Sequence, residues 1–509
     1  MKRIFTLLIL VLPFGVFSQQ KVFDITHYGA KADGVTNNTQ SIQKAIDEAN
    51  AQGGGTVYIP AGKFMTGVIY LKSNITLHLA DNAVLLASAR RLDYGSGYAS
   101  PVIVANGQQN IAITGKGIID GNGPALLKDI YRMLRAGTLR DSLWQKYNPW
   151  HQKQPEEPNR PKIIRFADCS NIRIKGVIIK DGVDWVQEYK NCSNMVIDSI
   201  KVISNVFWNN DGIDLVDCKN VVLTNSFFNA DDDGICLKSS DRNSRCENIF
   251  VSDCVVRSSA SAIKFGTASR GGFKNINITK VKIYDTYRSA VALEVVDGGK
   301  IENVNISDIN ATNVGNAIFI RIGHRNRDTV MSSIKGIHIS NLTAQIAKGK
   351  PDKGYPMEGP AVTTPHNIFP SAIAGLPGHP VRDVLLENIH ITYNGSASKK
   401  RAEVSLDALD AIPENPSDYP EFSMFDEIPA WGFYSRHAAG ITFKNVTLSC
   451  MGTDYRQVMV FDDVANLNLD GITVPQITGK PGIVLHKTEN PAIQNIKIGE
   501  ETKNNVVVK

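Results

Sequence analysis

The stretch Asn209-Asn-Asp-Gly-Ile-Asp214 is followed, after a short interval, by Asn229-Ala-Asp-Asp-Asp-Gly-Ile-Cys-Leu-Lys-Ser-Ser240. Asp211 and Asp233 are 22 residues apart, and residues 215–228 between them read as short apolar strands separated by turns. A group of carboxylates that returns after one such interval indicates a chain wound in stacked coils. We therefore expect acids of two neighbouring coils to lie side by side.

A related motif recurs on both sides of this stretch. Six times an Asn precedes a strand-like run of alternating apolar residues, at gaps of 23, 26, 28, 27 and 28 residues. These residues are Asn171, Asn194, Asn220, Asn248, Asn275 and Asn303, and the first four follow Cys169, Cys192, Cys218 and Cys246 by two positions. A repeat of this length, with several short strands and no helix, predicts an all-β fold, a single-stranded right-handed parallel β-helix.

Stacked coils lie about 4.8 Å apart, so equivalent residues of successive coils form ladders. An Asn ladder at a turn satisfies backbone groups there, and a row of Cys packs in a core like other small apolar residues. The chain has seven cysteines, which is an odd number, and their scatter fits neither a compact disulfide framework nor a zinc site. We therefore interpret them as core residues rather than catalytic thiols or disulfides.

Other segments depart from the repeat. Ile42, Ala45, Ile46 and Ala49 follow a helical spacing, which predicts an N-terminal helix that caps the open end of the coils. Three long interruptions are predicted loops: 123–161, which includes a helical stretch at 126–134 and an aromatic segment at 143–151, 348–380 and 397–431. Such loops either line a groove, where aromatic rings could stack on sugars, or only cover the flank of the solenoid.

The chain of 509 residues has a formal charge of +5 and no block of Lys or Arg, which argues against a nucleic-acid partner. Residues 1–19 have a basic start, an apolar run and a polar end, as in a signal peptide, and no Cys follows for a lipid anchor. No later stretch is apolar enough to insert in a membrane. We expect a periplasmic or secreted monomer in which residues 20–509 form a single catalytic domain.

On these motifs, the chain resembles glycoside hydrolase family 28, the polygalacturonase-like enzymes. Asn209–Asp214 is similar to the family's Asn-Thr-Asp-Gly-Ile-Asp, and Asp232–Ser240 to its Asp-Asp-Cys-Ile-Ala-Ile-Lys-Ser-Gly. Phe23–Gly34 and Gly53–Pro60 look like the opening shared by many pectin-active β-helix proteins. The resemblance implies a polysaccharide or oligosaccharide substrate and neither a cofactor nor a metal.

Inverting hydrolysis needs a protonated carboxyl for the leaving oxygen and an ionised carboxylate that activates water. By the matching motifs, Asp232 is the expected general acid, and Asp211 and Asp233 would hold and deprotonate the water. Crowded acids raise one another's pKa, so that one can stay protonated. A solvated or calcium-binding acidic turn is the alternative. Supporting roles are expected for Asp214 and Asp231. Asn209 and Lys238 are expected to bind substrate, and Lys238 also to pair with the acids.

Two parts of the family pattern are missing. Ser261 stands where the resemblance expects a histidine, and Ala292 and Glu294 stand where it expects the Arg and Lys that grip a galacturonate carboxylate. Their loss removes a bidentate grip, which makes plain polygalacturonan a doubtful substrate. Substitute substrate-binding residues, each of which could instead be an ordinary solvated side chain, are Ser261, Lys264, Arg288, Arg321, His324 and Arg325.

Three functions fit these observations. The first is an exported inverting glycosidase that acts on a pectin-like or other polysaccharide containing uronate and rhamnose, or on its oligosaccharides, in an exo-type pocket formed by the long loops. The second is a calcium-dependent polysaccharide lyase on the same fold, with an unsaturated product. The third is a carbohydrate-binding β-helix without turnover.

Overall fold

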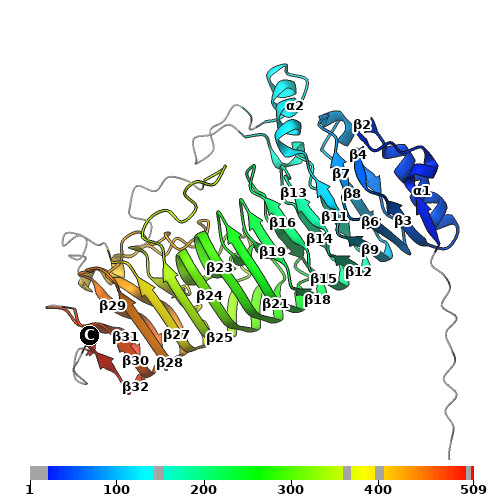
Figure 1. Ribbon diagram of the computed structural model, residues 1–509. Helices are drawn as coiled ribbons and strands as arrows, with labels where there is room; N and C mark the ends of the chain where they lie inside the picture. The colour runs from blue at the N-terminus through cyan, green and yellow to red at the C-terminus, as the bar shows by residue number, and fades with distance from the viewer. Residues whose placement is uncertain are drawn as a thin grey trace, which may run out of the picture.

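The computed structural model is an elongated solenoid whose coils run from the N-terminal helix at one end to the C-terminus at the other (Figure 1). It describes residues 21–142, 144, 154–358, 368–395, 406–477, 479–499 and 506–508. The predicted signal peptide and most of the aromatic segment 143–151 lie outside these residues. Every paired strand in the ladder is parallel to its neighbours, so the fold is the predicted parallel β-helix.

The coils place their strands on three faces. The strands of the first face are β5 (Ile69–Tyr70), β8 (Ile103–Asn106), β11 (Ile164–Ala167), β14 (Gln187–Lys190), β17 (Ile213–Val216), β20 (Ile235–Ser239), β22 (Ile263–Ser269), β26 (Ser371–Ala374), β29 (Gln457–Ala465), β31 (Ile483–Glu489) and β34 (Val506–Val508). The strands of the second are β1 (Val22–Asp24), β3 (Gly55–Ile59), β6 (Ile75–Leu79), β9 (Gln109–Gly115), β12 (Ser170–Lys175), β15 (Ser193–Asp198), β18 (Lys219–Thr224) and β32 (Ala492–Gln494). Strand β30 (Asn468–Val474) runs from this face onto the third, where β33 (Lys497–Ile498) pairs with its end.

The strands of the third face are β2 (Asp33–Asn37), β4 (Gly62–Thr66), β7 (Ala83–Ala87), β10 (Ile118–Asp120), β13 (Ile178–Lys180), β16 (Lys201–Ser204) and β19 (Phe227–Ala230). Longer strands run across a corner from one face to another. They are β21 (Cys246–Ser258), β23 (Gly272–Val295), β24 (Lys300–Ile322), β25 (Ser333–Ile346), β27 (Val381–Tyr393) and β28 (Ala430–Cys450).

The predicted Asn ladder is present, but it lies near the start of the strands of the second face rather than at a turn between strands. Asn220 donates its side-chain amide to the Oδ1 atom of Asn194 at 3.1 Å, and Asn248 donates to Asn220 at the same distance. The backbone of each is left-handed, with φ of 56° at Asn194 and Asn220 and 57° at Asn248. Asn tolerates this conformation better than most residues because its short polar side chain bonds locally. The recurrence of Asn is therefore explained by the left-handed backbone conformation at this position.

The cysteines of the repeat are free and buried, which confirms their assignment to the core. Cys218 donates its thiol to the backbone carbonyl of Tyr189 at 3.1 Å, and Cys246 donates to that of Leu215 at the same distance. Apolar residues that alternate along each strand fill the rest of the interior. In β18, for example, Val221 and Leu223 are buried while Val222 between them is 38% exposed.

Both predicted helices are present, as α1 (Thr39–Ala51) and α2 (Gly123–Arg135). In α1 the four apolar residues named above are fully buried, and the helix packs on β1, β3 and β5 at the N-terminal end; its role as a cap stays a prediction. Short 3₁₀ turns occur at Ile25–Tyr28, Arg91–Tyr94, Glu157–Asn159 and Leu406–Ala411. Among the described residues, no helix is long and apolar enough to span a membrane.

Candidate active site

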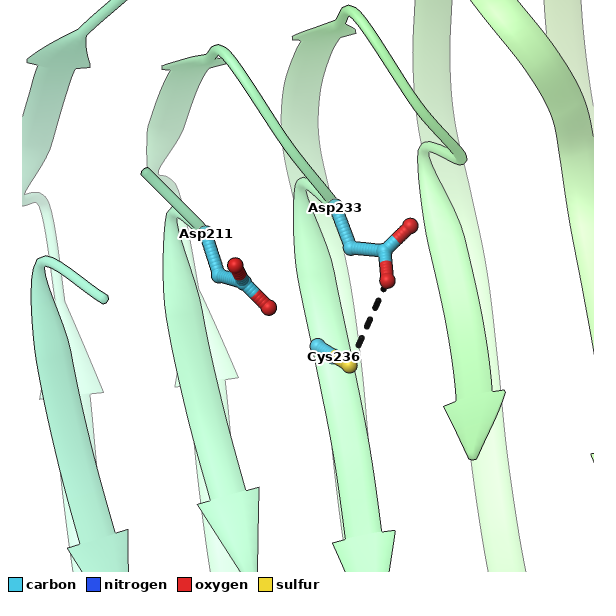
Figure 2. Close-up of side chains that lie close together, drawn as sticks. All are labelled: Asp211, Asp233 and Cys236. Carbon is cyan, nitrogen blue, oxygen red and sulfur yellow. Dashed lines mark hydrogen bonds between the residues drawn. The ribbon is translucent and has the colours of Figure 1, made fainter. Parts of the chain in front are cut away.

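The predicted acids meet where two neighbouring strands begin. Asp211 precedes β17 and Asp233 precedes β20, and the strands pair with Ile213 opposite Ile235. In this register each Asp lies two residues before the paired isoleucines, so the two carboxyl groups stack on successive coils (Figure 2). The 22-residue interval in the sequence is therefore one coil.

The chain bends at Asp231 and Asp232, just before β20. The bend lets the adjacent Asp232 and Asp233 avoid the alternation that would send them to opposite faces of a strand. Gly234 follows because there is no room for a side chain: a Cβ atom there would lie 2.3 Å from Val256 and 2.8 Å from the carbonyl oxygen of Ala262. Close packing between coils thus requires glycine at this position.

Lys238 is the buried cation of the site. Its ammonium lies 2.7 Å from Asp211 and also pairs with Asp214, while it sits 3.9 Å from the centre of the Trp185 ring. Burial alone would lower the pKa of Lys238, but Asp211 and Asp214 hold it well above its ordinary value. Burial raises the pKa of Asp214 to about 6, against the attraction of Lys238. Burial and then Asp214 raise the pKa of Asp211, and Lys238 favours its ionised form.

Asp232 is half-buried, whereas Asp211 and Asp233 are buried. Burial, then the charges of Asp211 and Asp233, raise the pKa of Asp232 to about 8. The side-chain amide of Asn209 donates to its Oδ2 atom at 3.4 Å, and Arg160 holds Asn209 by donating to its Oδ1 atom at 2.8 Å. Asp232 therefore carries its proton at neutral pH and is the most accessible of these three acids.

Asp233 is oriented from both sides. The backbone N–H of Ser261 donates to its Oδ1 atom at 3.0 Å, and the Cys236 thiol approaches its Oδ2 atom at 3.8 Å, as Figure 2 shows. One oxygen each of Asp211 and Asp233 and the Cys236 sulfur lie within 4.8 Å of one another, which is close enough for a metal ion. However, Lys238 already places a cation on Asp211, and burial raises the pKa of the Cys236 thiol well above its ordinary range. These groups favour a bound water over a metal.

The cations proposed for the substrate differ in their partners. Lys264 and Glu294 form a buried ion pair of 2.7 Å, so the lysine charge is neutralised inside the fold. Burial, opposed by Lys264, raises the pKa of Glu294 to about 7. Arg288 lies near Asp232 and Asp233, pairs with Glu421 at 3.3 Å, and lies 5.4 Å from the centre of the Tyr419 ring. Lys264 approaches the same ring at 5.3 Å.

Arg321 and His324 lie apart from the acids. The buried Arg321 donates to the backbone carbonyls of Gly375 and Glu414, and it stacks 5.1 Å from the centre of the Phe425 ring. His324 is half-buried and its backbone N–H donates to the Pro416 carbonyl at 2.6 Å. Both residues hold the loop that follows Leu406–Ala411 against the coils.

No sequence motif points to Trp185 or Tyr419 as a site residue. Trp185 occupies the position of Asp211 one coil earlier, because Glu188 pairs with Asp214 in the ladder. The gap of 26 residues between Asn194 and Asn220 is also the gap between Trp185 and Asp211, so the repeat could have located this tryptophan. Tyr419 comes from the long loop at 397–431, where no repeat sets the position of a side chain.

Residues 51–407 match the sequence model of glycosyl hydrolases family 28, and the chain therefore belongs to this family. It is 28% identical over 299 residues to an exo-poly-alpha-D-galacturonosidase of Dickeya chrysanthemi, which covers 50% of this chain and 49% of that protein. It is 25% identical to a probable polygalacturonase of Vitis vinifera over 72% of this chain and 68% of the relative.

A solved structure supports the fold assignment. The hyperthermoactive exopolygalacturonase from Thermotoga maritima superposes with a TM-score of 0.57 at 26% identity, over 73% of this chain and 87% of that one. The alignment with the Dickeya protein spans about half the length of that relative. The similarity alone therefore does not assign the activity or the substrates of that relative to this chain.

Proposed function

We propose that this protein hydrolyses glycosidic bonds in a pectin-like or other uronate-containing polysaccharide, or in its oligosaccharides, with inversion and after export from the cell. The observation that carries this proposal is the pairing of one accessible, protonated acid with two buried carboxyls. Asp232, whose pKa is about 8, would protonate the leaving oxygen. The similarity of this chain to the Thermotoga exopolygalacturonase supports this class of substrate.

Asp211 and Asp233 would hold the attacking water. Oxygens of the two carboxyls lie within 4.8 Å of one another. Since a hydrogen bond between oxygens is about 2.8 Å long, a single water can bridge them. Burial raises the pKa of Asp211, and Lys238, at 2.7 Å, opposes this rise and so favours the ionised form that a base needs. Direct attack by this water, without a covalent sugar intermediate, would invert the anomeric centre.

Arg288 is the best candidate to bind a substrate carboxylate. Lys264 is neutralised by Glu294 inside the fold, whereas the partner of Arg288 is the more exposed Glu421. Tyr419 is 47% exposed beside both cations and offers a ring on which a sugar can stack. In this arrangement, the loop that carries Tyr419 forms a wall of the substrate site and favours exo-type action.

Replacement of Arg288 by Lys should raise KM for a uronate-containing substrate about tenfold or more, because a lysine keeps the charge but loses the forked donor. Steady-state kinetics with purified protein would measure this change. Arg382→Lys, an exposed position on β27, is the matched control and should leave KM unaltered. An equal KM in the Arg288 variant and the control would show that Arg288 does not bind the substrate carboxylate.

Release of reducing ends from a panel of polysaccharides tests the function itself. The panel contains polygalacturonan, rhamnogalacturonan and marine uronate-rhamnose polymers, each with calcium and with a chelator. Hydrolysis of one polymer that persists with the chelator would support the proposal, and proton NMR of the first product would report inversion or retention. Activity that needs calcium and gives unsaturated ends would instead identify a lyase. Binding without release would indicate a carbohydrate-binding protein.

A further inference from the structure

A cavity lies at the far end of the strand that follows the acids. Strand β20 begins two residues after Asp233 and ends at Ser239, which lines this cavity of about 1030 Å³ together with Ser240. At about 3.3 Å per strand residue, the cavity is roughly 20 Å from Asp233 along the strand. Its volume is at the upper end of the range for ligand sites, about 300–1,000 Å³. None of the proposed catalytic acids lines it.

The floor of the cavity is held by hydrogen bonds. Asp217 accepts from the Ser239 hydroxyl at 2.6 Å and from the Ser240 N–H at 3.0 Å. The Arg270 N–H donates to the Ser239 carbonyl at 2.8 Å, and the Gly272 N–H donates to the Ser239 hydroxyl at 3.0 Å. The backbone beneath the arginine side chains is therefore fixed before any ligand arrives.

Six charged residues line the cavity, and they leave two positive charges in excess. They are Arg242, Arg270, Arg325, Arg327, Asp297 and Asp328. Arg325 forms a bidentate pair with Asp297 at 3.0 and 2.9 Å, and Arg242 pairs with Asp328. Within the described part of the chain, no acidic side chain forms an ion pair with Arg270 or Arg327. Like charges gathered around one cavity repel, and an arriving anion relieves that repulsion.

We propose that this cavity binds an anionic group of a polysaccharide, either a uronate carboxylate or a sulfate ester, on a sugar distant from the bond that is cleaved. A guanidinium presents paired donors that match both groups, and no ion pair among the described residues occupies the guanidinium of Arg270 or Arg327. Ser240, which also lines the cavity, offers a hydroxyl as a partner for a sugar hydroxyl. The assignment of a glycan rests on the proposed function, because the cavity shares β20 with the proposed catalytic site.

The test compares binding by Arg270→Ala/Arg327→Ala with binding by the wild type, both in the full chain. The probes are an oligogalacturonate long enough to span both sites, digalacturonate, dextran sulfate, neutral dextran and inorganic sulfate, measured by isothermal titration calorimetry. Arg173→Ala/Arg382→Ala removes the same charge from exposed positions on other strands and serves as the control. Asp232→Asn is added to every protein to prevent turnover.

The double variant should bind the long oligogalacturonate or dextran sulfate at least about tenfold more weakly than the control, with affinity for digalacturonate unchanged. Equal affinities in the variant and the control for both polyanions would overturn the proposal. Inorganic sulfate bound as tightly as the polyanions would overturn the assignment to a glycan. Hydrolysis is read separately, from the chain with Asp232 intact on the panel of polysaccharides. If binding depends on the two arginines but that chain hydrolyses no polymer, the proposed function alone is refuted. If that chain hydrolyses a polymer but the double variant binds as well as the control, this inference alone is refuted.

Discussion

Asp232→Asn should lower kcat by about 10²–10⁴-fold, because an amide cannot give a proton to the leaving oxygen. Its size and shape keep the contacts of the bend, and the fold should persist. Initial rates of reducing-sugar release on the best polymer of the panel would measure the loss. Asp253→Asn is the matched control, since Asp253 is exposed and has φ of 55°, a conformation that Asn accepts. Comparable rates in wild type and Asp232→Asn would exclude Asp232 as the general acid.

The carboxyl of Asp232 determines how both kcat/KM and the stability of the fold depend on pH. A general acid with a pKa of about 8 must be protonated to act, so kcat/KM should fall as the pH rises through about 8. In the unfolded chain, Asp titrates near pH 4. Between about pH 4 and pH 8, the folded state therefore holds a proton that the unfolded state has lost, and the contribution of Asp232 to stability decreases as the pH rises through this window.

Asp232→Asn removes that contribution. The variant should therefore gain stability over the wild type as the pH rises from about 5 to about 8, by on the order of 4 kcal/mol. Urea unfolding of both proteins at several pH values would measure the difference. A difference in the free energy of unfolding that does not change with pH would mean that the pKa of Asp232 is ordinary in the folded state.

Lys238→Met should lower the free energy of unfolding by about 3–5 kcal/mol near neutral pH, because it leaves Asp211 and Asp214 buried without their cation. Methionine fills much of the volume of lysine, so the loss is chiefly electrostatic. Since burial already raises the pKa of Asp214 to about 6, acidification below that value protonates this carboxyl and should reduce the loss. Urea unfolding near pH 5 and near pH 7.5 would measure both effects.

The double variant Asp214→Asn/Lys238→Met is the control for this prediction. Removal of one acid together with the lysine should restore part of the lost stability, and the double-mutant cycle gives the coupling between the pair. A loss below about 1 kcal/mol in Lys238→Met, or no recovery in the double variant, would show that the two carboxyls do not depend on Lys238.

The repeat made the fold predictable. The Asn spacing predicted the coils because Asn220 and its equivalents occupy a left-handed position that recurs at the same place in successive coils. The interval between Asp211 and Asp233 likewise predicted that these acids would meet, since one coil returns the chain to the same face. The division into residues 1–19 and a single catalytic domain at 20–509, and the roles of the site residues, remain predictions.

What the sequence alone determined is thus the part of the protein governed by local conformation and by the period of the coil: the parallel β-helix, its ladders and the meeting of the acids. Only the tertiary structure decided which of the candidate cations are paired inside the fold. Lys264 lies on β22 and Glu294 on β23, and their pairing cannot be read from either strand alone. Tyr419 reaches Arg288 from a loop outside the repeat, because contacts distant in sequence set the course of that loop.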